Sequence, residues 1–229
     1  MKKLARSIFL ASLALAGTTL HAAPLELECA SRTGSDQARI SKLGAGVVVR
    51  KGAHLLKVST KAGVQSFKDE PPYDEPMDGV HYYFCDRKEG FVLVNVEDAY
   101  EFTGKLINEQ TGAVTEGGTS VLFSEDRRAY LAASHGGGLG GDAWAVYAVN
   151  GEMSWSGYNF ISDPDKRSRY VDLGMPTWMP NGELVATATC ASDQKRQWKM
   201  KLVKNHGWWD WAPRKKCPPM KDMPFKAPG

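Results

Sequence analysis

The sequence predicts an all-β fold built of repeated antiparallel meander units. Short runs of β-branched and aromatic residues recur along the chain, separated by breaks that contain glycine, asparagine, aspartate or proline. After the first 22 residues, no window of about a dozen residues keeps the apolar stripe of an amphipathic helix. The second half of the chain also contains two segments that align with each other.

The clearest strand candidates lie between residues 47 and 123. Each is a short run rich in valine, leucine or aromatic residues, and each is followed by turn-forming residues. These candidates are 47–49, 55–60, 81–85, 91–96 and 121–123.

The two aligned segments share three blocks in the same order. Residues 123–132 align with 178–186 after a gap of one residue, 144–147 align with 198–201, and 151–155 align with 207–211. Because the three blocks keep their order and nearly constant spacing, we interpret them as two copies of one multi-strand unit.

Within these units, the phrase PTWMPNGEL at 176–184 resembles the W-S-P-D-G turn of β-propeller blades, such as those of the periplasmic Tol-system propeller. Residues 123–126 are similar, although Arg127 stands in place of the usual glycine. The resemblance covers 119–157 and 174–213 and implies a small propeller-like fold of about four blades, in a single domain over 23–213. A β-sandwich of two similar halves is the alternative.

The first 22 residues have the layout of a secretory signal peptide. The basic N-terminal region contains Lys2, Lys3 and Arg6, and an apolar run covers 8–16. Small residues then precede the expected cleavage after Ala22. No cysteine lies near the cut, so we expect no lipid anchor, and the mature protein is expected to be periplasmic or secreted.

The charge of the mature chain is close to zero. The whole chain has 29 basic and 26 acidic side chains, and the leader removes three basic ones. A neutral surface predicts neither nucleic-acid binding nor broad binding to anionic membranes, although the proline-rich tail 214–229 is basic. No second apolar stretch approaches the roughly 20 residues of a transmembrane helix.

Four cysteines remain after processing: Cys29, Cys85, Cys190 and Cys217. An even number in an exported chain predicts two disulfides, for which three connectivities are possible. We favour Cys29–Cys85 and Cys190–Cys217, because each pair then ties one half of the chain. The four histidines of the mature chain show no metal-ligand spacing, so neither a metal site nor a cofactor is predicted.

The first candidate binding segment is the acidic, proline-rich stretch 69–79, in which we select Tyr73, Asp74 and Glu75. Its prolines hold the chain extended at low entropic cost, which favours contact with a partner. The same carboxylates could instead hold a hard cation or serve as an acid/base pair, although their spacing is not that of an EF-hand loop. A solvated connecting loop is the other interpretation.

The second candidate is His135, which precedes a glycine-rich stretch over 136–141. The tetrad His-Gly-Gly-Gly matches an oxyanion-hole motif of lipases, but the chain lacks the Gly-x-Ser-x-Gly elbow that this chemistry requires. Ser134 is a poor nucleophile for His135, because neighbours on a strand point to opposite faces. We therefore interpret this stretch as an inter-strand loop that could contact a partner.

The third candidate is Trp208. In the alignment Trp211 matches Trp155 and Trp209 matches Met153, which predicts that these four side chains share a core-facing side at period two. Trp208 then lies on the opposite side, where an exposed tryptophan would be a strong contact residue. Packing of Trp208 under the tail is the alternative.

Together these features predict an exported, non-catalytic binding protein of the bacterial envelope. We expect it to recognise another envelope or secreted protein, as an inhibitor, an immunity-type protein or an assembly factor. The alternative is a hydrolase of envelope glycan or peptide, which for a glycan would need two carboxyl groups about 5–9.5 Å apart across a cleft.

Overall fold

The computed structural model describes residues 24–29, 35–73, 78–99, 101–136, 141–162 and 170–218. The expected leader and the last part of the basic tail lie outside these ranges. The described residues are mainly antiparallel strands, which confirms the all-β prediction. No helix among them is long and apolar enough to cross a membrane.

Most of the strands form four antiparallel meanders that follow one another along the chain, and a short pairing between one strand of each joins the second and third meanders into one nine-stranded sheet. The first contains β2 (Val48–Arg50), β3 (Leu55–Thr60) and β4 (Gly63–Lys68). The second contains β5 (Val80–Lys88), β6 (Phe91–Asp98), β7 (Glu101–Asn108) and β8 (Val114–Glu116). The third contains β9 (Ser120–Phe123), β10 (Ala129–Gly136), β11 (Asp142–Ala148) and β12 (Met153–Tyr158). The fourth contains β15 (Thr177–Trp178), β16 (Leu184–Cys190), β17 (Asp193–Asn205) and β18 (Trp208–Ala212).

The remaining elements complete these units. Strand β1 (Glu26–Glu28) pairs with β9, and β13 (Phe160–Ser162) pairs with β14 (Tyr170–Leu173), which pairs with β16. A short helix, α1 (Gln37–Arg39), continues into one turn of π-helix at Ile40–Gly44. The sequence pattern did not reveal this helical segment, because it is too short to show an apolar stripe. The five strand candidates overlap β2, β3, β5, β6 and β9, and β3 has the predicted bounds.

The two segments that align in sequence are the third and fourth meanders, and their turns have the same geometry. The aligned residues Arg127 and Gly182 both have positive φ, at 57° and 79°. In each turn the preceding side chain, Asp126 or Asn181, accepts a hydrogen bond from a main-chain N–H two residues later, at 3.1 Å. Gly151 and Gly207, at the next aligned turn, both have a φ of 91°. Arg127 thus adopts the left-handed conformation for which glycine was expected.

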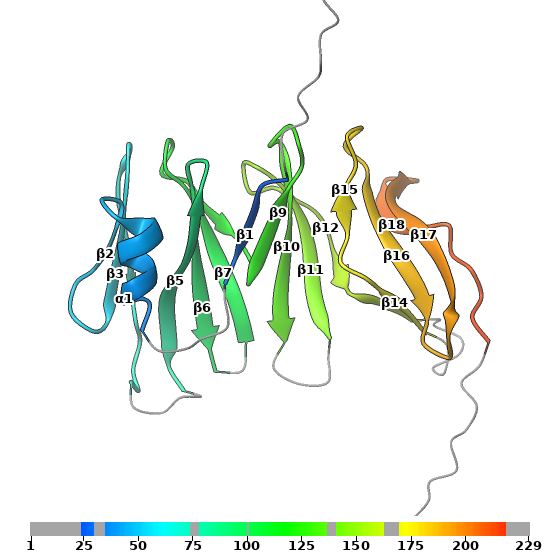
Figure 1. The fold of residues 1–229 in the computed structure, drawn as a ribbon, viewed down its shortest axis with the longest axis horizontal. Coiled ribbons are helices and arrows are strands. Elements are labelled where there is room, and N and C mark those ends of the chain that lie inside the picture. The colour runs from blue at the N-terminus through cyan, green and yellow to red at the C-terminus, as the bar shows by residue number, and fades with distance from the viewer. Residues whose placement is uncertain are drawn as a thin grey trace, which may run out of the picture.

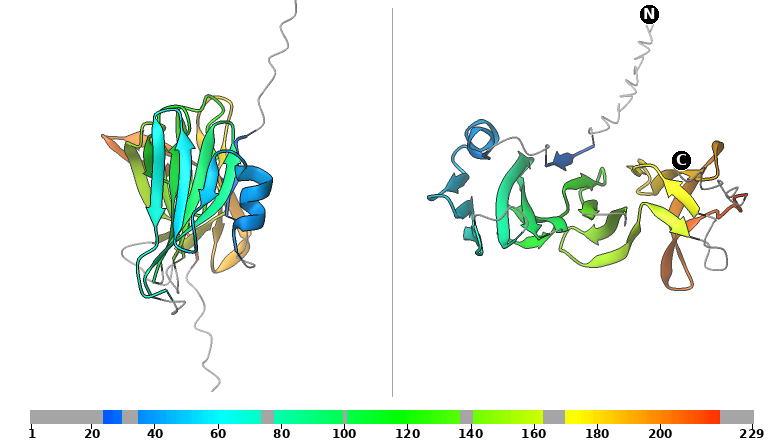
Figure 2. Two further views of the ribbon diagram at one scale, coloured as in Figure 1. Left: turned by 90° about the vertical axis from the view of Figure 1, so that its left-hand side faces the viewer. Right: turned by 90° about the horizontal axis from the view of Figure 1, so that it is seen from below.

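The meanders stack face to face in a row along the long axis of the molecule (Figures 1 and 2). One hydrophobic core lies between each neighbouring pair. The first core joins Leu56 and Val58 to Phe84 and Ile107, and the second joins Leu93 and Leu106 to Phe123 and Tyr130. The third joins Leu131 and Trp144 to Ala188, Met200 and Trp211. Each inner meander is therefore covered on both faces, and the first and fourth meanders lie at opposite ends of the row.

Both disulfides form as predicted. Cys29 bonds to Cys85 and ties β1 to β5, and Cys190 bonds to Cys217 and ties the end of β16 to the chain after β18. Disulfides of this kind belong to proteins that fold in an oxidising, extracytoplasmic compartment.

We expect replacement of Cys190 and Cys217 together by alanine to lower the free energy of unfolding by about 2–4 kcal/mol, because the bond closes a long loop of the unfolded chain. Urea unfolding followed by tryptophan fluorescence measures this directly, since all seven tryptophans lie between residues 144 and 211. The double alanine variant of Cys29 and Cys85 is the matched control. Its loss of stability should appear mainly in unfolding curves followed by far-UV circular dichroism. An unchanged fluorescence midpoint in the first variant would contradict the prediction.

Candidate functional site

The acidic segment is described at its two ends. The ring of Tyr73 is 43% exposed and stacks on His54 with centroids 3.9 Å apart. Asp69 is buried, accepts a hydrogen bond from the Tyr82 N–H at 3.0 Å, and faces the His54 imidazole at 3.3 Å. Asp69 therefore anchors the start of the segment. Asp74 and Glu75 lie outside the described residues.

His135 lies at the end of β10, where it pairs across the strands with Asp142 of β11. Its Nδ1 is 2.5 Å from the Asp142 carboxylate, and its side chain is largely exposed. Ser134 faces the other side of the sheet, where it lines a depression described below. The serine and the histidine are thus not placed to act on one substrate.

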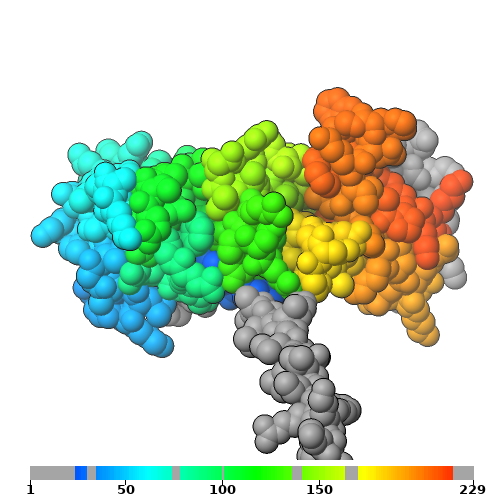
Figure 3. All heavy atoms as spheres, turned by 90° about the horizontal axis from the view of Figure 1, so that it is seen from above, coloured from blue at the N-terminus to red at the C-terminus, as the bar shows by residue number. Residues whose placement is uncertain are grey.

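Trp208 follows the turn between β17 and β18 and is 81% exposed. The β17–β18 hairpin projects from the row of meanders in the view from above (Figure 3). Trp211 is buried and meets Trp155 edge to face at 5.8 Å, as the alternation predicted. The same alternation was wrong for Trp209 and Met153, which are 38% and 55% exposed, because the core ends before this end of the hairpin.

These selected residues do not form one site. Tyr73 follows the first meander, His135 belongs to the third, and Trp208 belongs to the fourth. Strand β10 ends at the lower edge in Figure 1, whereas the β17–β18 turn lies at the upper edge. Each residue must therefore be judged on its own surroundings, and Trp208 has by far the largest exposed apolar surface of the three.

Charge is distributed unevenly along the row. Residues 78–162, which form the second and third meanders, hold twelve acidic and five basic side chains. Residues 170–218, around the fourth meander, hold eight basic and four acidic side chains. The near-zero charge of the mature chain therefore hides an acidic centre and a basic C-terminal end, the end that carries Trp208.

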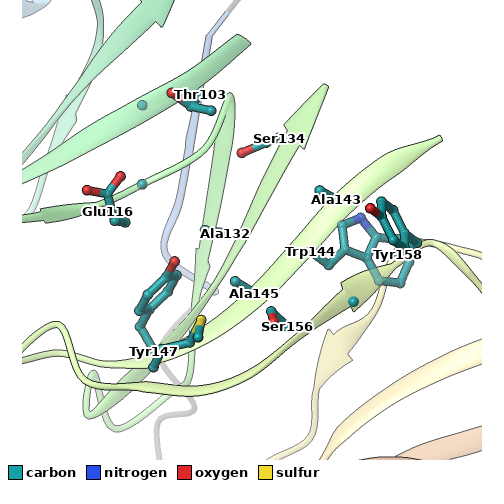
Figure 4. Close-up of a pocket in the computed structure, with 14 residues that line it drawn as sticks. Thr103, Glu116, Ala132, Ser134, Ala143, Trp144, Ala145, Tyr147, Ser156 and Tyr158 are labelled. Carbon is teal, nitrogen blue, oxygen red and sulfur yellow. The ribbon is translucent and has the colours of Figure 1, made fainter. Parts of the chain in front are cut away.

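A second surface feature lies between the second and third meanders, and the sequence did not predict it. It is an open depression of about 450 Å³ on the face of β10, β11 and β12, bordered by β7 and β8 (Figure 4). We call it the trough. It is lined by Thr103, Gly104, Glu116, Gly117, Ala132, Ser134, Ala143, Trp144, Ala145, Tyr147, Met153, Ser156, Gly157 and Tyr158.

The strand register explains the shape of the trough. Ala132, Ala145 and Ser156 lie side by side on three neighbouring strands and form a floor of small side chains. Tyr158 borders the floor at one end, beside Ala143, and Tyr147 borders it at the other (Figure 4). Small residues in the middle and tyrosines at the two ends make a shallow channel that follows the direction of the strands.

The lining of the trough is mainly apolar, with a few hydroxyl groups, and carries little charge. Among its described lining residues, Glu116 is the only acidic or basic one, and it pairs with Lys105. Burial, and to a smaller extent the charge of Glu116, raises the pKa of the Tyr147 hydroxyl, which therefore remains a hydrogen-bond donor at neutral pH. Ser134, Ser156 and Thr103 add further hydroxyls.

The described residues contain no group of three or more histidine, cysteine, aspartate or glutamate side chains that could hold a metal ion. When the chain is compared with known proteins, no family model, no curated protein and no solved structure matches it, so the resemblance of its turns to those of propeller blades stays a prediction.

Proposed function

We propose that this protein is exported and acts by binding, and that the β17–β18 hairpin recognises an acidic surface on another envelope or secreted protein. The observation that supports this most directly is Trp208, whose ring is 81% exposed beside a hairpin turn. Tryptophan is the residue type most enriched at binding hot spots, and an indole left in water gains much when a partner covers it. The signal-like residues 1–22 and the two disulfides support an extracytoplasmic location.

The hairpin holds Trp208 on a rigid support. Strands β17 and β18 pair continuously from Lys201–Ala212 to Asn205–Trp208. Asp210 accepts a hydrogen bond from the Trp211 N–H at 2.8 Å and forms an ion pair with Arg214 at 2.7 Å. A contact residue on such a support loses little conformational entropy on binding.

Charge around the hairpin favours an acidic partner. Lys199 donates a hydrogen bond to the Thr187 hydroxyl rather than to a carboxylate. Lys204, opposite Trp209 in the register, forms no ion pair within the described part of the chain. Because residues 170–218 hold eight basic and four acidic side chains, complementary charge on a partner would speed association and make it sensitive to salt.

We expect Trp208→Glu to abolish partner capture while it changes the free energy of unfolding by less than about 0.5 kcal/mol, because an exposed side chain contributes little to the fold. The oxidised mature protein, immobilised, is incubated with envelope extract of the organism that makes it, and the retained proteins are identified by mass spectrometry. Val64→Glu is the matched control, since Val64 is 57% exposed on β4 of the first meander.

The informative protein is one retained by the wild type and by Val64→Glu but lost with Trp208→Glu. Its dissociation constant should rise with ionic strength if charge complementarity contributes. A partner retained equally by Trp208→Glu would refute the hairpin as the site, and unfolding of Trp208→Glu would show that the residue packs rather than binds.

A further inference from the structure

We infer that the trough binds an uncharged oligosaccharide, a second ligand that the proposed protein recognition does not require. The first reason is its form. The channel of about 450 Å³ is open to solvent and lies over β10, β11 and β12, with Ala132, Ala145 and Ser156 as its floor. Such an open channel of small residues admits a chain of sugar rings rather than enclosing a single compact molecule.

The second reason is the placement of aromatic rings. Tyr158 is 53% exposed at one end of the floor, and its ring stacks on Phe160 with centroids 5.4 Å apart and an interplanar angle of 18°. Tyr147, at the other end, stacks on the buried Tyr130 at 5.3 Å. Both rings are therefore supported from one side. A ring held in this way offers a fixed apolar surface to the C–H face of a sugar, and a hydroxyl beside it.

The third reason is the combination of a few hydroxyl groups with low charge on a mainly apolar lining. Hydroxyl groups of Ser134, Ser156 and Thr103 lie along the trough, and Glu116 supplies a carboxylate acceptor. Lys105 pairs with that carboxylate, so the lining presents almost no net charge to a ligand. Hydroxyl donors and acceptors in an environment close to neutral match the hydroxyls of a neutral glycan. A phosphorylated or strongly ionic ligand would find no countercharge.

A peptide is a poorer match because β10 and β11 are paired on both sides, and the edge of β12 that is unpaired among the described strands lies at the border of the floor rather than over it. Strand β10 pairs with β9 and β7 on one side and with β11 on the other, and β11 pairs with β10 and β12. The main-chain groups of β10 and β11 are thus used within the sheet, so a peptide strand could add only beside β12 and not over the floor. Hydrolysis is not part of the inference, since Glu116 is the only carboxylate among the described lining residues and a glycosidase pair needs two.

The test uses three neutral hexasaccharides, maltohexaose, cellohexaose and chitohexaose, with a neutral glycine–serine hexapeptide for comparison. Isothermal titration of the mature oxidised protein should give saturable binding of at least one hexasaccharide and none of the peptide. Tyr158→Ala should weaken that binding by about tenfold, through loss of the stacking surface. Ala145→Arg, which fills the middle of the floor, should abolish it.

Tyr73→Ala is the matched control, because it removes an exposed tyrosine far from the trough and should leave sugar binding unchanged. Trp208→Glu should also leave it unchanged, so failure of the hairpin proposal and failure of this one can be told apart. The inference is overturned if no hexasaccharide saturates below about 10 mM, or if only the peptide binds. It is also overturned if Tyr158→Ala and Ala145→Arg, folded by circular dichroism, bind a sugar as the wild type does.

Discussion

Replacing Asp36 with alanine is expected to lower the free energy of unfolding by about 3–5 kcal/mol, the usual cost of removing one partner from a buried ion pair. Asp36 is only 5% exposed and receives Arg50 at both oxygens, at 2.9 and 2.6 Å. It also accepts the Phe84 N–H at 2.9 Å. One carboxylate thus joins the start of the short helix, strand β2 and strand β5. Its loss leaves the Arg50 guanidinium, which is 11% exposed, without its countercharge, and leaves the buried Phe84 N–H without its acceptor.

Far-UV circular dichroism during urea unfolding is the suitable measurement, because no tryptophan lies in this half of the chain. The double variant Asp36→Leu with Arg50→Met is the control. It removes both charges together and should be more stable than Asp36→Ala, since no charge is left buried without a partner. Asp36→Ala within about 1 kcal/mol of the wild type would show that the pair does not hold the first meander to the second.

The sequence allowed the strands and disulfides to be predicted because these features depend on local patterns and on compartment. Alternation and turn residues located β3 with its correct bounds, and the even cysteine number in an exported chain led to the observed pairs. The two aligned segments are the third and fourth meanders, and their turns have matching geometry. This holds even at Arg127, which stands where a glycine was expected. Local geometry was therefore preserved although the residue type was not.

The trough could not be predicted, because its lining comes from five strands and consists mostly of residues that are common everywhere. Ala132 and Ser134 on β10, and Ala143 and Ala145 on β11, are small at every second position. Such alternation is visible in the sequence, but it becomes a floor only once the register places the four side by side. The alternation of side chains along a strand likewise predicted that Trp209 faces the core. This alternation does not indicate where along a hairpin the core ends.

The one feature of the sequence that is specific to the trough is the set of glycines at its border. Each of them lies where two main chains come into contact. A Cβ atom on Gly104 would lie 2.2 Å from the carbonyl oxygen of Gly118, and one on Gly118 would lie 2.2 Å from that of Ala133. At this crossing the second meander therefore meets the third through main-chain atoms. That close crossing is what leaves Gly104 and Gly117 as one wall of the trough.

Gly118→Ala is accordingly expected to destabilise the protein by about 3 kcal/mol or more, because the added methyl meets main-chain atoms that cannot rotate away. Besides the oxygen, the Cβ would lie 2.7 and 2.8 Å from the carbonyl carbon and nitrogen of Ala133. The same oxygen accepts the Thr119 N–H at 2.7 Å, so a shift of either chain also costs that hydrogen bond. The φ of Gly118 is not in the left-handed region, so the contact alone sets the cost.

A graded series separates this contact from a general effect of removing glycine. At Gly174 the nearest atom to an added Cβ is 3.6 Å away, so Gly174→Ala should be nearly neutral. At Gly117 the nearest atom is a leucine methyl at 3.1 Å, which can move, so Gly117→Ala should lie between the two. Urea unfolding followed by both circular dichroism and fluorescence tests the order. If Gly118→Ala is no less stable than Gly174→Ala, the second and third meanders are not joined by this crossing, and the trough wall would need another explanation.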